Sequence, residues 1–305
     1  MNVVKRGEGM HTMSRLSAAY HNGVPLAFNN QSKIIFFSDI HRGDNSISDE
    51  FAHNQNIYFH ALNHYLQEDY TYIEVGDGDE LWEHSKFKHI RGAHNDVYAL
   101  LRKFYVDGRF HMLYGNHNMS FKYSQCVSKS LYEFIDEYKD EMSPLFPGIE
   151  VHEALIMTHE ETGKEIFVVH GHQGDFINDH IWRLMKYVNR HFWHYLHIVG
   201  FRNPASPAKN RHKRHKIEKN YTKWIKEHRK MLIVGHTHRP KFPSDHEEPY
   251  FNTGSCLFPR SITGLELCEG KIGLVDWRIK PDDEGILHIS KTYLKGPEAI
   301  EKFLL

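Results

Sequence analysis

Five short apolar runs recur along the chain, and each is followed within three residues by a polar side chain of a metal-ligating type. Runs of three to five residues, rich in β-branched and aromatic side chains and bounded by glycine and polar residues, are typical of buried strands. They cover residues 34–37, 72–75, 110–113, 166–169 and 232–234. The pattern therefore predicts an α/β fold whose buried strands end in polar residues.

Helical spacing marks one of the connections. Between the first two runs, Phe51, Tyr58, Leu62 and Tyr65 recur at the spacing of a helix face. This pattern predicts a crossover helix that packs on the sheet between two parallel strands.

Further strands are predicted after the last of the five runs. Residues 250–252 have a strand-like composition, and Glu269-Gly270 separates residues 264–268 from 272–277 like the turn of a hairpin. We expect these late strands to complete a second sheet.

The stretch 176–230 differs from the rest of the chain because its first helix is apolar on more than one face, and such a helix needs cover on two sides. Arg183 and Lys186 interrupt it, which excludes a membrane span. One apolar stripe holds Ile177, Ile181, Leu184, Val188 and Tyr195, a second holds Trp182, Met185, Trp193 and Leu196, and a following helix is predicted by Ile217, Tyr221, Trp224 and Ile225.

The second half of this stretch is basic. Residues 211–230 hold nine Lys or Arg against Glu218 and Glu227. A solvated helix face is the ordinary interpretation. Two alternatives stay open: a cap whose aromatic side holds an apolar substrate part and whose basic side meets phosphate or an anionic membrane surface, or a homodimer that buries Trp182 and Trp193.

The polar residues after the five runs form a set with one chemistry. In an α/β sheet the carboxyl ends of the strands meet at one crevice, so residues far apart in sequence converge there. Carboxylate, amide and imidazole ligands without thiolate suit manganese, iron or zinc, and seven ligands suffice for two ions when a carboxylate bridges them. The motifs are Asp39-x-His41, Gly76-Asp77, Gly115-Asn116-His117, His170-Gly171-His172 and Gly235-His236-Thr237-His238.

This ordered series resembles the calcineurin-like metallophosphoesterases. The resemblance implies two facing mixed β-sheets flanked by helices, a four-layer sandwich with a helical cap insertion. It implies that His117 faces the substrate phosphate and that Asp77 bridges two metal ions, manganese being the first expectation. It places Asp39, His41, Asp77 and His238 on one ion, and Asp77, Asn116, His170 and His236 on the other.

Neighbouring residues refine this picture. Asn118 stands where the family usually has an acid, so we expect Glu80, rather than Asp79, to orient His117. His170 follows its strand directly and is the expected ligand, whereas His172 is expected to support the site or contact substrate. Arg42 is either a phosphate contact or a surface residue.

One branch of the family, the UDP-2,3-diacylglucosamine diphosphatases, shows some likeness in three places. These are residues 76–82, the helical insertion after Gly171, and residues 252–255. That branch typically carries Arg where this chain has His117, and likeness of fold does not name a substrate.

The implied activity is that of a metal-dependent phosphoesterase, a hydrolase acting on ester bonds. Metal-activated hydroxide would attack a phosphodiester, diphosphate or phosphomonoester, with His117 assisting the leaving oxygen. The expected partner is a phosphorylated small-molecule or lipid-linked substrate. Two alternatives are a nucleic-acid phosphodiesterase that uses the basic insertion and a non-catalytic scaffold that kept the fold.

Composition bounds these expectations. A net charge of −1 gives no global field to recruit nucleic acid, so nucleic acid is not the expected partner. Three well-separated cysteines, Cys126, Cys256 and Cys268, argue against a disulfide framework and fit a cytoplasmic location, with peripheral contact at the inner membrane surface as an open alternative.

The expected organisation has three parts. Residues 1–32 contain no apolar signal-like core and are predicted to be an N-terminal arm. Residues 33–305 are predicted to form the metallophosphoesterase domain, and residues 176–230 the helical, basic insertion within it.

Overall fold

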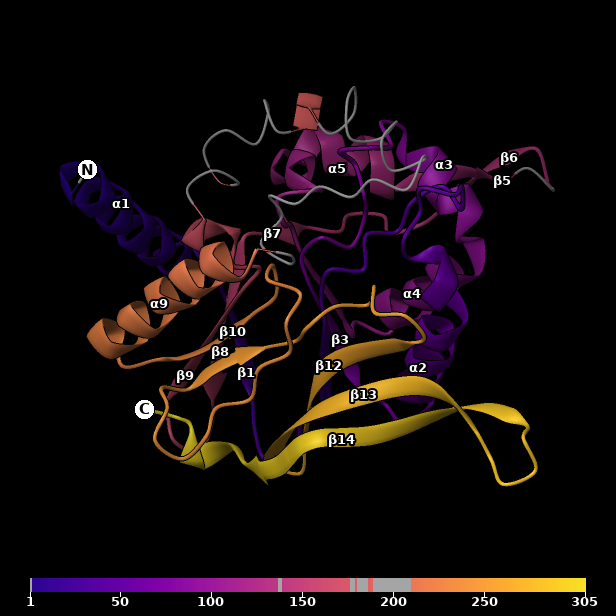
Figure 1. The fold of residues 1–305 in the computed structure, drawn as a ribbon. Coiled ribbons are helices and arrows are strands. Elements are labelled where there is room, and N and C mark those ends of the chain that lie inside the picture. Colours follow the sequence, from indigo (N-terminus) through magenta and orange to yellow (C-terminus); the bar gives the residue numbers. More distant parts are fainter. Residues whose placement is uncertain (1, 137–138, 176–178, 180–185, 189–209) are drawn as a thin grey trace.

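The computed structural model describes residues 2–136, 139–175, 179, 186–188 and 210–305. These residues form a mixed α/β structure with two large sheets, as the strand pattern predicts (Figure 1). Among them, no helix has the length and apolarity needed to cross a bilayer.

The first large sheet has seven strands and is parallel on one side and antiparallel on the other. Its parallel half carries three of the predicted strands, and the predicted hairpin forms its antiparallel half. The order is β14 (Leu287–Ala299), β13 (Lys271–Pro281), β12 (Ser261–Cys268), β2 (Ile34–Phe37), β3 (Thr71–Val75), β4 (Phe110–Leu113) and β7 (Val151–His152).

The second large sheet has five strands and contains the other two predicted strands. Only the β8–β9 pair is antiparallel. The order is β1 (Val24–Phe28), β8 (Ala154–His159), β9 (Glu165–Val169), β10 (Met231–Val234) and β11 (Tyr250–Asn252). A separate hairpin joins β5 (Glu133–Asp136) to β6 (Glu141–Pro144).

Helices cover the outer face of each sheet. In Figure 1, α1 and α9 lie beside the five-stranded sheet, whereas α2 and α4 lie beside the seven-stranded one. The helices are α1 (Asn2–His21), α2 (Gln55–Gln67), α3 (Phe87–Ala93), α4 (Asn95–Val106), α5 (Ser124–Leu131) and α9 (Arg211–His228), and the short 3-10 turns are η1 (Ala52–Asn54), η2 (Met119–Lys122), η3 (His172–Gly174) and η5 (Ile300–Lys302).

Alternation along the strands divides the apolar side chains between separate clusters. On β2, Ile35 and Phe37 join the cluster that includes α2 and α4, whereas Ile34 and Phe36 join the cluster shared by both sheets. Successive strand residues point to opposite faces, so a strand covered on both sides is apolar throughout. A third cluster packs β9 and β10 against α1 and α9. Each large side chain buried in this way contributes roughly 1.5–3 kcal/mol.

The predicted N-terminal arm over residues 1–32 is wrong. These residues form α1 and then β1, which pairs in parallel with β8 at the edge of the five-stranded sheet. Among the side chains of α1 that the structure describes, from residue 12 on, the apolar ones in the core are Met13, Leu16 and Ala19, which give a weak periodic signal. Pro25 lies on β1, where proline is tolerated because the strand is at the edge of the sheet. The α/β unit therefore begins before residue 33.

Two further expectations need correction. Of the late strands expected in a second sheet, β11 does join the five-stranded sheet, whereas the hairpin does not, because β12 pairs with β2 in the sheet that already holds β3 and β4. The aromatic side of α9 does not face a crevice, since Ile217, Tyr221, Trp224 and Ile225 are buried in the cluster against the five-stranded sheet. The two stripes predicted over residues 177–196 fall almost entirely outside the described residues.

Candidate metal centre

Six of the seven predicted ligands come together although they leave two different sheets. Asp39 and His41 follow β2, Asp77 follows β3 and Asn116 follows β4, all in the seven-stranded sheet. His170 follows β9, and His236 and His238 follow β10, in the five-stranded sheet. We call these seven residues the metal-ligand cluster. It lies where the carboxyl ends of parallel strands from both sheets meet.

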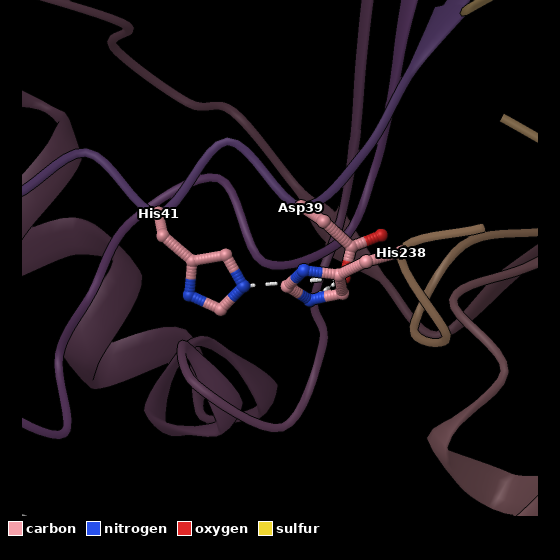
Figure 2. Close-up of side chains that lie close together, drawn as sticks. All are labelled: Asp39, His41 and His238. Carbon is pink, nitrogen blue, oxygen red and sulfur yellow. Dashed lines mark ion pairs between the residues drawn. The ribbon is translucent and has the colours of Figure 1, made fainter. Parts of the chain in front are cut away.

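One group in the cluster contains Asp39, His41 and His238, whose ligand atoms lie within 4.8 Å of one another. The Oδ1 of Asp39 is 3.1 Å from Nε2 of His238 and 3.9 Å from Nε2 of His41. Figure 2 shows both imidazoles reaching from their loops toward this carboxylate. Three such atoms around one point can hold a divalent cation.

A second group contains Asp77, His170 and His236, again within 4.8 Å. Oδ2 of Asp77 is 3.2 Å from Nε2 of His170 and 3.7 Å from Nε2 of His41. The same carboxylate oxygen thus faces both groups, as a bridging ligand must. Asn116 is buried.

The backbone at the cluster is unusual in its conformation. Five of the seven residues have left-handed φ angles between 50° and 64°. Non-glycine residues rarely adopt that region, and such residues cluster at functional sites. The five are Asp39, His41, Asp77, His236 and His238.

Glycines permit the close approach of the loops. Gly76 has a φ of +81°, and a Cβ there would lie 2.6 Å from ring atoms of His170. A Cβ on Gly115 would overlap the Asp77 carboxylate, and one on Gly235 would overlap the Asp39 carboxylate. These three glycines are therefore required by the ligands that pack against them.

The donor atoms of the cluster fit divalent cations. Four of them, although buried, have no hydrogen-bond partner: Asp39 Oδ1, His41 Nε2, Asn116 Oδ1 and His170 Nε2. Asp39 Oδ1 faces the two imidazole nitrogens at 3.1 and 3.9 Å without hydrogen-bond geometry. Burying such polar atoms without partners costs free energy unless a ligand such as a cation binds them. Oxygen and imidazole nitrogen are ligands that manganese, iron and zinc accept.

The electrostatics of the cluster favour a bound cation. Burial by itself raises the pKa of Asp39, but the His238 and His170 imidazoles outweigh it and lower that pKa to about 2. Burial lowers the pKa of His41, yet the hydrogen bond with Glu80 and the charge of Asp77 raise it to about 10. His41 thus holds a proton that balances the carboxylates, and a metal ion bound there would displace that proton.

His117 lies at the mouth of the cluster, where its side chain keeps 19% exposure. Glu80 Oε2 is 2.6 Å from its Nδ1 and 2.8 Å from Nδ1 of His41. Glu80, rather than Asp79, is therefore the acid that lies against His117, although Nδ1 of His117 has no partner in hydrogen-bond geometry. The ring of His117 also stacks on Trp82 at a centroid distance of 4.1 Å. Nothing in the sequence indicated this contact except that Trp82 lies two residues after Glu80.

Asn118 supports the third motif in another way. It is fully buried, and its Oδ1 accepts a hydrogen bond from the Gly115 amide at 2.6 Å. It shapes the loop that carries Asn116 and His117, so the acid that usually follows this motif is not needed for that purpose.

Arg42 is neither a phosphate contact nor a surface residue. It is completely buried, donating from Nε to Asp79 at 2.9 Å and from Nη1 and Nη2 to Glu74 at 2.8 Å. Tyr98 donates to Asp79, and Tyr72 donates to Glu74 at 3.0 Å. We call these five residues the Arg42 cluster. No simple sequence signal marks it, because Arg42 adjoins a predicted ligand.

His172 is buried and does not join the ligand groups formed by described residues. Its ring centroid lies 5.5 Å from that of His170, and neither ring nitrogen has a hydrogen-bond partner. Burial and the nearby His170 charge lower its pKa well below the usual value. His170 is thus the histidine that lies among the other ligands.

Two residues at the site escaped the sequence analysis. Asp175 follows η3, and its Oδ2 is 3.4 Å from Nε2 of His236 and 2.9 Å from Nζ of Lys213 on α9. Asp175 could have been noticed as an acid that follows His170 by five residues in a glycine-containing turn. No sequence signal pointed to Lys213.

Comparisons with known proteins add little. No family model and no curated protein matches the chain. Among solved structures, Vps29 from Chaetomium thermophilum matches over 87% of this chain and 96% of that chain, with 10% identity and a TM-score of 0.36. A score of that size shows too little common geometry to support an inference about function.

Proposed function

We propose that this protein is a two-metal phosphoesterase with the metallophosphoesterase arrangement of two facing sheets between helical layers. The observation that carries the proposal is the metal-ligand cluster, which gathers from five strand ends and includes four buried ligand atoms without hydrogen-bond partners. Two divalent cations bound there would supply Lewis acidity, making a water reactive near neutral pH and neutralising phosphate charge.

The protein's own residues supply the remaining parts of the reaction. Asp77 is placed between the two ligand groups, and Glu80 fixes the rings of His41 and His117 at once. Because Glu80 occupies Nδ1 of His117, the other ring nitrogen is left to hold a proton for the leaving oxygen of a substrate. Its stack on Trp82 keeps the ring in that orientation.

The nucleic-acid alternative gains no support from α9. Several of its basic residues pair with carboxylates: Lys213 with Asp175, Lys223 with Glu227 and Lys226 with Glu248. A phosphorylated small-molecule or lipid-linked substrate remains the proposed class. All seven ligand positions hold residues that can bind metal, and several of their ligand atoms are unpaired. Both observations favour an enzyme over a scaffold.

The test is hydrolysis by protein stripped with a chelator and then supplied with Mn²⁺. An aryl phosphodiester is assayed beside the corresponding monoester, in wild-type protein and in Asp77→Asn. We expect metal-dependent turnover that the substitution abolishes, and the ratio of diester to monoester rates assigns the ester class. If the wild-type protein neither hydrolyses an ester nor binds metal, that result would support the scaffold instead.

A further inference from the structure

Asp175 connects the metal-ligand cluster with α9. Only 4% of this residue is exposed, and its backbone amide donates to the His172 carbonyl at 2.8 Å, which fixes the turn that carries it. Oδ2 lies between His236 Nε2 at 3.4 Å and Lys213 Nζ at 2.9 Å. One carboxylate oxygen is therefore shared by a predicted ligand and a helix lysine.

The contact with Asp175 determines how His236 is presented. With Nε2 facing Asp175, Nδ1 is the ring nitrogen left for a metal ion. The backbone of His236 is also fixed, because its amide donates to Asp39 Oδ2 at 2.9 Å and its φ is +64°. A carboxylate on the far nitrogen of a ligating histidine sets the tautomer and ring orientation and raises ligand basicity.

Lys213 is held in place by the start of α9. Its amide donates to Oδ1 of the N-cap residue Asn210 at 3.0 Å, so the lysine stands in the first turn. Further along the helix, Tyr221 donates to the Gly171 carbonyl at 2.7 Å and Asn220 to the Gly174 carbonyl at 3.2 Å. Side chains of α9 thus donate hydrogen bonds to both ends of the turn between His170 and Asp175.

We propose that Asp175 is a positioning residue for the metal site of His236, and that Lys213 couples the docking of α9 to occupancy of that site. The inference rests on the proposed metal centre but goes beyond it, because it assigns a role to a helix outside the ligand motifs. A cation held by His236 would polarise the ring and strengthen its contact with Asp175. Coupling between binding and docking is reciprocal, so docking of α9 in turn strengthens metal binding.

Calorimetric titration with Mn²⁺ measures the effect in the full chain. Removing the partner of a ligating histidine typically weakens metal binding by about 10–100-fold. We expect Asp175→Ala to weaken one of two sites by that factor and leave the other unchanged. Asp175→Asn, which keeps the shape, should lose about tenfold at the same site.

Lys213 variants test the coupling. Lys213→Met should weaken the same site less than Asp175→Ala does, and Lys213→Arg should restore it. Lys223→Met is the matched control, because Lys223 lies on the same helix and pairs with Glu227 at 3.7 Å in solvent. Amide exchange should show that Mn²⁺ protects α9 in the wild-type protein and in the control but not in Asp175→Ala.

Electron paramagnetic resonance separates positioning from mere structural support. With two equivalents of Mn²⁺, the wild-type protein should give the spectrum of a coupled pair, and Asp175→Ala that of an isolated ion plus free Mn²⁺. Two sites of wild-type affinity in Asp175→Ala would overturn the inference. Equal weakening of both sites, with loss of stability in the metal-free protein, would overturn it as well.

The outcomes also separate this inference from the proposed function. Two bound Mn²⁺ ions and the expected variant effects without hydrolysis of either ester would leave the positioning role standing and remove the phosphoesterase proposal. Failure of the wild-type chain to bind Mn²⁺ would overturn both.

Discussion

Two buried polar clusters lie side by side at the ends of β2 and β3, and they balance their charges in different ways. In the Arg42 cluster, three guanidinium nitrogens reach two carboxylates at 2.8–2.9 Å, and Arg42 lies 5.2 Å from the ring centre of Tyr98. Asp79 Oδ2 is the one carboxylate oxygen there without a partner among described residues. The metal-ligand cluster instead leaves four ligand atoms unpaired.

The two clusters are built from the same segments of chain. His41 points to the ligands and Arg42 to the core, and likewise Glu80 serves the histidines whereas Asp79 serves Arg42. The backbones are tied as well, because the Glu80 amide donates to the Arg42 carbonyl at 3.0 Å. The comparison teaches that burial of charge does not identify a functional site. What sets the metal-ligand cluster apart is the concentration of unpaired atoms of ligand type, since most buried polar groups in a folded protein are paired.

The largest expected effect breaks the paired cluster. Arg42→Met leaves the Glu74 and Asp79 carboxylates buried without their cation, and removing one partner of a buried pair costs about 3–5 kcal/mol. The free energy of unfolding in urea should fall by that amount in metal-free protein. Lys223→Met, at an exposed pair, is the control and should change stability by less than about 1 kcal/mol. A small loss for Arg42→Met would mean that the two clusters do not differ in this way.

The next effect comes from filling the unpaired cluster. At free Mn²⁺ a hundredfold above the dissociation constant, one site stabilises the folded protein by about 2.7 kcal/mol. Chelator-stripped protein should therefore gain stability on adding Mn²⁺, as measured by denaturant unfolding. Asp77→Asn should lose most of this gain, while its metal-free stability stays within about 1 kcal/mol of wild type, because the amide oxygen can still accept from the His117 amide. Equal stability of wild-type protein with and without Mn²⁺ would contradict the proposal.

A smaller effect is expected at the residue that joins the two histidines. Glu80→Gln keeps the shape but removes the charge that both imidazoles face. Loss of such a partner weakens metal binding by about 10–100-fold, or about 1.4–2.7 kcal/mol. Mn²⁺ titration measures it, and unchanged affinity would show that Glu80 acts on His117 alone.

The smallest effect concerns a partly exposed ion pair, in which the side chains of Glu165 and Lys230 are 26% and 29% exposed. Glu165 lies 2.7 Å from Lys230, and the hydrogen bonds from Lys230 and Tyr20 lower the pKa of its carboxyl below the usual 4.5. A lowered pKa gives stability that is present above pH 4.5 and is lost as the pH falls through the folded value. Glu165→Gln should therefore destabilise by less than about 1 kcal/mol at pH 7, and the difference should vanish on acidification. If Glu165→Gln lowered the free energy of unfolding as much as Arg42→Met does, solvent exposure would not explain the difference between this ion pair and the Arg42 cluster.

Much of the site could be predicted from sequence because its residues adjoin strong strand signals. The five strands fall within one residue of their predicted bounds, and six of the seven predicted ligands fall into groups whose ligand atoms lie within 4.8 Å of one another, while Asn116 is buried. The buried face of α9 also consists of the four predicted residues. Periodicity and local spacing carry this information, since a buried strand is apolar throughout and a loop ligand must follow it closely.

The remainder depended on contacts between distant residues. The role of Arg42 follows from Glu74 lying across the neighbouring strand, and that of Asp175 from Lys213 on a helix 38 positions later in the chain. The N-terminal helix and its strand were missed because α1 offers few apolar residues and finds its partners in β8, η3 and α9.

The sequence by itself determined the strands, the ligand types and the chemistry they suit, because each is encoded within a few consecutive residues. Only the tertiary structure decided that three ligand loops leave one sheet and two leave the other, and which buried charges are paired. The physical reason is that pairing depends on distance in space. Neighbours such as His41 and Arg42 point to opposite sides of the same segment, and only the packed chain shows which partners each one meets.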